Sequence, residues 1–178
     1  MQAAQLIADR LAEFYRPEIE ASQAGLVQLL VSINDECHAW GVNPETNRSL
    51  GAAVATIAWL APSRELLVFQ AGDTLPLRFD GSRMIELAHR QGSGNCVDKY
   101  FGQGSGFNPV CTHSDFDEGD TLCLITDGVT KTMSNREIEQ VLKDYPDPNR
   151  AANELVTRAF NLGSRDDITA MVIELDEW

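Results

Sequence analysis

The chain has 178 residues, 43% of them apolar, which is enough for one compact domain with a hydrophobic core. Its 27 acidic and 14 basic residues give a formal net charge of -13 at pH 7, and a field of that sign repels nucleic acid phosphates and anionic lipid heads. We therefore expect a single domain, residues 1–178, that binds neither nucleic acid nor membranes.

The cysteines and the apolar stretches indicate a cytoplasmic protein. Cys37, Cys96, Cys111 and Cys123 are widely spaced and include no C-x-x-C pair, which is typical of reduced thiols. Residues 1–16 lack the basic start and apolar core of an export signal, and no apolar run reaches the roughly 20 residues of a membrane span. We therefore expect a cytoplasmic protein without an export signal or a membrane anchor.

Two helices are predicted at the start of the chain. In residues 3–14 apolar side chains recur every three or four positions, until Pro17 ends or kinks the pattern. A second pattern of this kind covers residues 22–37, with Gly41 near its end. Each helix therefore has one apolar face to bury.

From residue 51 the pattern becomes that of strands. Short apolar runs are separated by turn residues, and the dipeptide Asp80-Gly81 is a strong tight-turn signal. The run 121–126 contains almost no polar residue, which is typical of a central strand covered on both sides. The predicted strands are 53–60, 66–70, 75–79, 84–87, 110–113, 121–126 and 168–175.

Helices return between the last two predicted strands. Ser134 followed by Glu137 forms a capping box, which predicts a helix from Ser134 to about Leu142. Asn149 is the predicted cap of a further helix that Gly163 closes. The order of two helices, a strand meander, two helices and one strand predicts an α+β domain with antiparallel strands in layers.

Three aspartates at the ends of predicted strands, Asp73, Asp127 and Asp166, are the candidate metal ligands. An aspartate beside a glycine after a strand has an ordinary explanation in turn geometry. Three such sites favour a cation site, because Mg²⁺ and Mn²⁺ prefer carboxylate oxygens from several strands. A metal-bound water is a potent nucleophile, so the pattern predicts a metal-dependent hydrolase.

The glycine-rich segment 102–106 suggests a phosphate cradle at first sight. Such cradles present backbone amides at the start of a helix, whereas Phe107-Asn-Pro109 leads towards a strand. We therefore interpret the segment as a flexible loop.

The motifs around the aspartates occur in a fixed order: Gly72-Asp73, then Thr126-Asp127-Gly128, then the segment 163–169. This set resembles the metal-dependent protein phosphatase 2C family. The run 118–128 is similar to the family's glycine-aspartate turn, hydrophobic strand and serine-aspartate-glycine, with threonine in the serine position. The segment 97–102 is similar to one that ends in leucine-glycine, so the resemblance covers nearly the whole chain.

The resemblance implies a fold and an activity. The implied fold is an antiparallel β-sandwich flanked by pairs of helices, with residues 3–14 and 22–37 covering one sheet. The implied activity is removal of phosphate from phosphoserine and phosphothreonine in proteins, by direct attack of a metal-bound water.

The resemblance also implies roles for individual residues. Asp127 and Asp166 are expected to bind the catalytic Mn²⁺ or Mg²⁺ ion, and Asp73 to hold an additional ion together with Asp127. The neighbouring residues expected to support these ligands are Gly128, Asp167 and Thr169.

The chain departs from the family pattern at its start. Family members open with a segment that supplies a phosphate-binding arginine and an aspartate bridging two metal ions, whereas Met1 matches the start of the first family helix. We thus expect a domain that is incomplete at its N-terminus and lacks the opening strands. Lys131 also stands where some members place a further metal-binding acid.

Two alternatives follow from these departures. One is a catalytically impaired phosphatase-like module that acts as a regulatory binding protein. The other is a chain whose natural form has residues before Met1. Absent opening strands would expose sheet edges, so a second copy or a partner chain is expected to bind at these edges. The resemblance implies a phosphoprotein substrate as the other partner.

Overall fold

The structure is a computed structural model that describes residues 2–15, 22–46, 49–61, 63–89, 91–93 and 96–175. It contains two compact units, one formed by Met1–Gly72 with Gln91–Thr112 and the other by Asp73–Arg90 with His113–Trp178. Each unit has its own buried apolar cluster. The single domain expected from the sequence stays a prediction.

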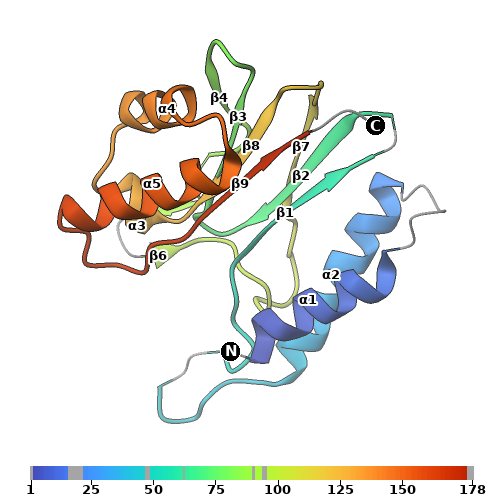
Figure 1. The fold of residues 1–178 in the computed structure, drawn as a ribbon. Helices are drawn as coiled ribbons and strands as arrows, with labels where there is room; N and C mark the ends of the chain where they lie inside the picture. Colours follow the sequence, from blue (N-terminus) through green and yellow to red (C-terminus); the bar gives the residue numbers. More distant parts are fainter. Residues whose placement is uncertain are drawn as a thin grey trace. The chain divides into compact units, whose positions relative to one another are not determined.

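The first unit combines a helix pair with a sheet of order β1-β2-β7 (Figure 1). The helices are α1 Gln2–Phe14 and α2 Gln23–Ala39, and the strands are β1 Ala55–Leu60, β2 Glu65–Ala71 and β7 Val110–Asp115. β7 ends in residues that are counted with the second unit. Two short strands, β5 Gly92–Ser93 and β6 Cys96–Val97, form a separate pair.

The two helices pack on one face of this sheet. Ile7 of α1, Leu30 of α2 and Phe69 of β2 belong to one buried cluster. Leu67, Phe69 and Ala71 are alternate residues of β2 and therefore point to the same side of the sheet. The apolar faces predicted for the first two helices are thus buried on β2.

The second unit contains a four-stranded antiparallel sheet of order β4-β3-β8-β9 and three helices. The strands are β3 Leu75–Phe79, β4 Met84–Glu86, β8 Thr121–Ile125 and β9 Ala170–Glu174. The helices are α3 Asp127–Thr130, α4 Asn135–Asp144 and α5 Pro148–Asn161. β8 lies between β3 and β9, which confirms the central strand predicted from its apolar sequence.

α4 and α5 cover one face of this sheet (Figure 1). Ile138 of α4 and Leu155 of α5 are fully buried in one cluster with Leu77, Cys123 and Ile125 of the strands. Burial raises the pKa of the Cys123 thiol to about 12, so this cysteine behaves as an apolar core residue.

The α+β class and the order of elements are confirmed, with changes at some ends. The predicted capping box at Ser134 is present. The cap of α5 was predicted wrongly: Asp147, not Asn149, accepts the hydrogen bond from the Arg150 amide, because Pro148 takes the first helical position. Within the described ranges, no helix is both long enough and apolar enough to cross a bilayer.

The capping box at the start of α4 generates a stability prediction. The Ser134 hydroxyl accepts a hydrogen bond from the Glu137 amide, and Glu137 Oε2 accepts one from the Ser134 amide at 2.8 Å. Ser134→Ala removes one of these caps and is expected to lower the free energy of unfolding by about 1 kcal/mol in urea unfolding followed by circular dichroism.

Ser164 provides the control, since its buried hydroxyl has no hydrogen-bond partner among the residues that the structure describes. Ser164→Ala should leave stability unchanged or raise it slightly, because no hydrogen bond is lost. Equal losses in both variants would contradict the capping interpretation.

The turn at Asp80 generates a pH prediction. Hydrogen bonds from the Ser82 hydroxyl and from the backbone amides of Arg83 and Ser82 lower the pKa of the Asp80 carboxyl. A lowered folded-state pKa adds stability above the ordinary value of about 4, and this stability is lost as pH falls through the folded-state pKa. Asp80→Ala should therefore be less stable than wild type at pH 7 and equally stable in strong acid; a gap independent of pH would contradict this.

Candidate active site

The pairing of β9 with β8 positions two of the three candidate aspartates. Ile125 at the end of β8 lies opposite Ala170 at the start of β9. Asp127 is the first residue of α3, two positions after β8, and Asp166 lies in the loop before β9. The antiparallel register therefore brings the segment after β8 beside the segment before β9.

Thr126 links these two segments through hydrogen bonds. Its hydroxyl donates to the carbonyl oxygen of Asp167 at 3.0 Å and accepts from the amide of Thr169 at 2.9 Å. The Thr126 amide also donates to the Thr169 carbonyl at 3.1 Å. These bonds continue the β8–β9 contact beyond the sheet.

Gly128 allows the Asp166 loop to approach the start of α3. A Cβ atom at this position would lie 2.4 Å from the carbonyl oxygen of Asp167 and 3.2 Å from the Cα of Ile168. Distances this short to backbone atoms cannot be accommodated by a side-chain rotation. The glycine is thus required by the close approach of two backbone segments.

Lys131 joins the two carboxylates. Its Nζ lies 2.6 Å from Oδ2 of Asp127 and 2.7 Å from Oδ2 of Asp166. Hydrogen bonding to Asp127, and next to Asp166, raises the pKa of the Lys131 ammonium above its ordinary value, against a smaller opposing effect of desolvation. The side chain of Asp127 is 17% exposed and that of Asp166 is 48% exposed, so the pair opens to solvent on the Asp166 side.

The structure does not gather the third aspartate into one metal-binding group with these two. Asp73 is half-buried in the bend that follows β2. Among the residues that the structure describes, no three His, Cys, Asp or Glu side chains gather closely enough to hold a metal ion. The structure therefore brings together Asp127 and Asp166, with a lysine in place of a third carboxylate.

The remaining predicted residues act here through their backbones. Asp167 contributes the carbonyl that accepts from Thr126, and its amide donates to Oδ1 of Asp166 at 3.0 Å. Thr169 contributes the amide and the carbonyl that bond to Thr126. Their exposed side chains have no part in these bonds.

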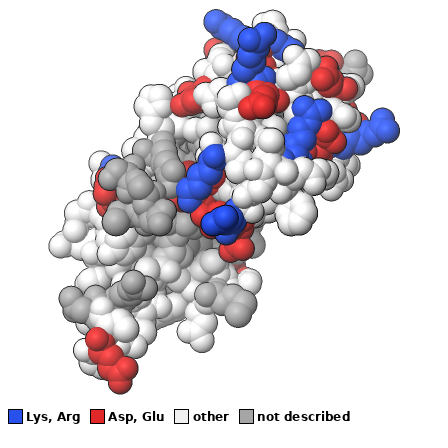
Figure 2. All heavy atoms as spheres, turned by 90° about the vertical axis from the view of Figure 1, so that its left-hand side faces the viewer, with Lys and Arg blue, Asp and Glu red and all other residues white. Residues whose placement is uncertain are grey.

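Basic and acidic side chains are interspersed on the face of the molecule drawn in Figure 2. In Figure 2, blue lysine and arginine side chains lie mostly against red aspartate and glutamate side chains. Ion pairs of the second unit include Arg78 with buried Asp120 at 2.7 Å and Arg83 with Asp80 at 3.2 Å. The pairing of Lys131 with two acids follows this general pattern but involves one cation and two anions.

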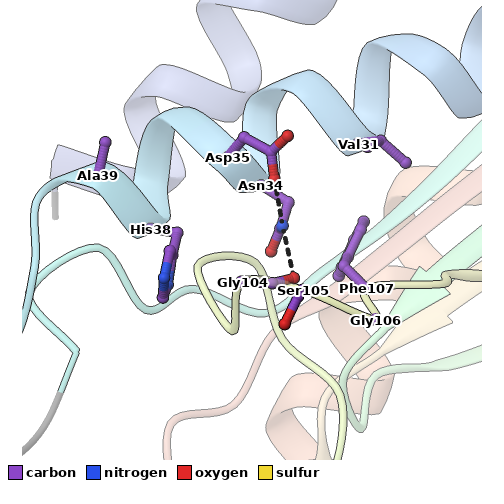
Figure 3. A pocket seen from close by; sticks show the side chains of 9 residues that line it. All are labelled: Val31, Asn34, Asp35, His38, Ala39, Gly104, Ser105, Gly106 and Phe107. Atoms are coloured by element: carbon purple, nitrogen blue, oxygen red, sulfur yellow. Dashed lines mark hydrogen bonds between the residues drawn. The ribbon is translucent and has the colours of Figure 1, made fainter.

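A groove of about 450 Å³ lies in the first unit, between α2 and the glycine-rich loop 102–106 (Figure 3). Buried Asn34 holds the loop: its Nδ2 donates to the carbonyl of Gly104 at 3.1 Å and its Oδ1 accepts from the amide of Gly102 at 2.9 Å. The ring of His38 lies 3.2 Å from the Gly102 carbonyl. These polar groups hold the loop against α2.

The pairing of Lys131 with both acids is the feature that sequence reasoning missed. Its spacing of four residues from Asp127 is the spacing of helical ion pairs and was the available signal. The contact with Asp166 spans 35 residues of sequence and depends on the strand register.

The close approach at Gly128 generates a prediction. Gly128→Ala should push the Asp166 loop away from α3 and lower the free energy of unfolding by about 1–3 kcal/mol, the usual cost of overpacking. The Thr169 amide, which bonds to Thr126, should also lose protection from hydrogen exchange.

Gly81→Ala is the control, because Gly81 has φ of +81° and no part of the described chain lies within 4 Å of an added Cβ. It should cost only the backbone strain of about 1 kcal/mol and leave the Thr169 amide protected. Unchanged protection in Gly128→Ala would show that the loop tolerates a side chain there.

Comparison with curated proteins finds phosphatase 2C relatives. Protein phosphatase 2C homolog 4 of Schizosaccharomyces pombe is 38% identical over 66 residues, covering 37% of this chain and 17% of the relative. Serine/threonine phosphatase stp of Listeria monocytogenes is 34% identical over 61 residues, covering 34% of this chain and 24% of the relative. The aligned region thus spans roughly a fifth of these relatives.

Solved structures of bacterial proteins, two of them described as serine/threonine phosphatases, share the fold. The serine/threonine phosphatase PstP/Ppp of Mycobacterium tuberculosis superposes with a TM-score of 0.81 at 20% identity, over 98% of this chain and 82% of that one. The PstP catalytic domain in complex with two manganese ions gives 0.81 at 19% identity, over 98% and 81%. PppA of Pseudomonas aeruginosa gives 0.78 at 21% identity, over 96% and 77%.

These matches confirm the predicted resemblance to phosphatase 2C and the predicted α+β fold. A family model described as Stage II sporulation protein E (SpoIIE) matches residues 3–176. Because this match covers nearly the whole chain, the chain belongs to the Stage II sporulation protein E family, with the fold of the phosphatase 2C-like serine/threonine phosphatases.

Proposed function

We propose that the protein is a phosphatase 2C-like hydrolase that removes phosphate from phosphoserine and phosphothreonine in proteins with the help of Mn²⁺ or Mg²⁺. The observation that carries the proposal is the convergence of Asp127 and Asp166 on one cationic atom. The phosphatase 2C names of its relatives, and the two manganese ions in the PstP catalytic domain, support it.

The carboxylate pair suits a hard divalent cation. The Lys131 ammonium marks the position that a metal ion would take, since one Oδ2 atom from each aspartate contacts the same positive centre. Mg²⁺ prefers oxygen ligands and keeps several waters, so that two carboxylates suffice to hold it. The exposure of Asp166 leaves room for those waters. The residues present thus fit such an ion, with Asp73 proposed as the ligand of an additional one.

The chain's own residues would bind the metal ion and orient its ligands. A bound Mn²⁺ or Mg²⁺ ion supplies an acidified water and an electrostatic partner for phosphate oxygens. Asp127 and Asp166 hold the cation, and the hydroxyl of Thr126 keeps their two segments in register. The Asp167 amide fixes the orientation of the Asp166 carboxylate through its bond to Oδ1. These supports act on the ligands rather than on the substrate.

Removing a carboxylate tests the proposal. Asp127→Asn and Asp166→Asn should each lower Mn²⁺-dependent phosphate release from a phosphoserine peptide by at least about 100-fold, because a lost ligand exceeds the 10–100-fold effect of supporting residues. Asp144→Asn on α4, which removes an acid that pairs with Gln140, should keep wild-type activity. Metal-independent release, or none by the wild-type chain, would contradict the proposal.

A second candidate is a phosphatase-like module that binds a regulatory partner. The observation in its favour is that Lys131 already neutralises one charge of the carboxylate pair. Among the described strands β9 is the last of its sheet, and its residues Met171 and Ile173 are 52% and 44% exposed. A second copy or a partner chain is therefore proposed to add at this edge. A stable dimer in sedimentation together with no Mn²⁺ binding in calorimetry would favour this candidate; a monomer that binds the ion would exclude it.

We also propose a cytoplasmic location. Cys37, Cys111 and Cys123 are free thiols, as expected in a reducing compartment. Microscopy of the tagged full-length protein would test this, and a signal at the cell envelope would contradict it.

A further inference from the structure

Lys131 occupies a place from which it contacts both candidate ligands at once. It follows the short helix α3 as its cap residue, four positions after Asp127, and reaches Asp166 across the loop before β9. Both contacts end on one nitrogen and use one Oδ2 atom of each aspartate. The ammonium therefore sits where the two carboxylates come nearest to a shared cation.

A divalent ion and this ammonium cannot share the position. The ion would use the same Oδ2 atoms, and two positive centres within a few ångströms of each other repel strongly. The Lys131 side chain is 37% exposed, so it has solvent into which it can swing. Ion binding thus requires that the hydrogen bonds from Lys131 to Asp127 and Asp166 break.

We propose that Lys131 competes with a divalent cation for Asp127 and Asp166. Its ammonium occupies their Oδ2 atoms until the cation displaces it. This inference rests on the proposed function, because it takes the carboxylate pair as the cation site. Its consequence is a threshold: the site fills only at cation concentrations high enough to displace the lysine. Lys131 is a positioning residue in this role, since it acts through the ligands.

Stability alone cannot reveal this role. Exposed ion pairs contribute little to folding, so a merely structural Lys131 and a competing one would look alike in an unfolding experiment. Metal affinity distinguishes the two roles. A competing lysine weakens metal binding, whereas a lysine that only positions the carboxylates strengthens it.

Lys143 offers a matched control. It pairs with Glu139 at the same four-residue spacing and is 38% exposed, close to the value for Lys131. It contacts one carboxylate on α4 and neither candidate ligand. Lys143→Met therefore removes a comparable charge from the same unit without opening the site.

The test is direct titration of the full chain with MnCl₂, with free Mn²⁺ followed by its electron paramagnetic resonance signal. Lys131→Met should bind Mn²⁺ about 10-fold to 100-fold more tightly than wild type, a change of the size that residues contacting metal ligands produce but of opposite sign, because a competing contact is removed. Lys143→Met should bind as wild type does, and Asp127→Asn should not bind. Lys131→Gln, checked by circular dichroism, serves if the methionine variant does not fold.

The outcomes separate the two proposals. Equal or weaker binding by Lys131→Met, with clear binding by wild type, overturns the competitor role and leaves the proposed function standing. No Mn²⁺ binding by wild type or by either Lys131 variant overturns the cation site itself, and the competitor role with it.

Discussion

The pairing of β9 with β8 is the constraint on which the candidate site depends. These strands run antiparallel from Thr121 opposite Glu174 to Ile125 opposite Ala170. A slip of one residue would turn every side chain of β9 to the other face and would separate Thr126 from Thr169. The register thus fixes both the core contacts of Val172 and the approach of the Asp166 loop to α3.

The two carboxylates of the candidate site need their charge balanced. Two carboxylates brought together repel each other and need a cation or several hydrogen-bond donors. Here the protein meets that need with a side chain of its own, Lys131, in addition to the amide that supports Asp166. A similar arrangement holds buried Asp120, which accepts from Arg78 and from the Asp117 amide. The net charge of -13 therefore coexists with locally satisfied acids.

Local rules predicted much of the fold, and long-range register explains most of what they missed. The cap at Ser134 and the turn at Asp80 each depend on residues within three positions, and both were visible in the sequence. The cap of α5 was misplaced because Asp147 and Asn149 are both good caps, and only the placement of Pro148 in the helix decides between them.

The candidate ligands were likewise predictable from local sequence only in part. Their positions at strand ends were readable from the apolar runs, and the hydroxyl at Thr126 was readable as a substitute for the family's serine. That Asp127 and Asp166 meet at Lys131 depends on the pairing of two strands separated by more than forty residues, which no local pattern encodes.

The presence of a separate apolar cluster in each unit has a practical consequence for spectroscopy. Trp40 and Trp59 both pack against the cluster of the first unit, whereas Asp127, Asp166 and Lys131 belong to the second. In a chain with Trp178 replaced by phenylalanine, tryptophan emission would report only on the surroundings of Trp40 at the end of α2 and Trp59 on β1. Tyr145 packs against the other cluster, whereas Tyr15 and Tyr100 belong to the first unit, so tyrosine emission would not separate the two halves in the same way.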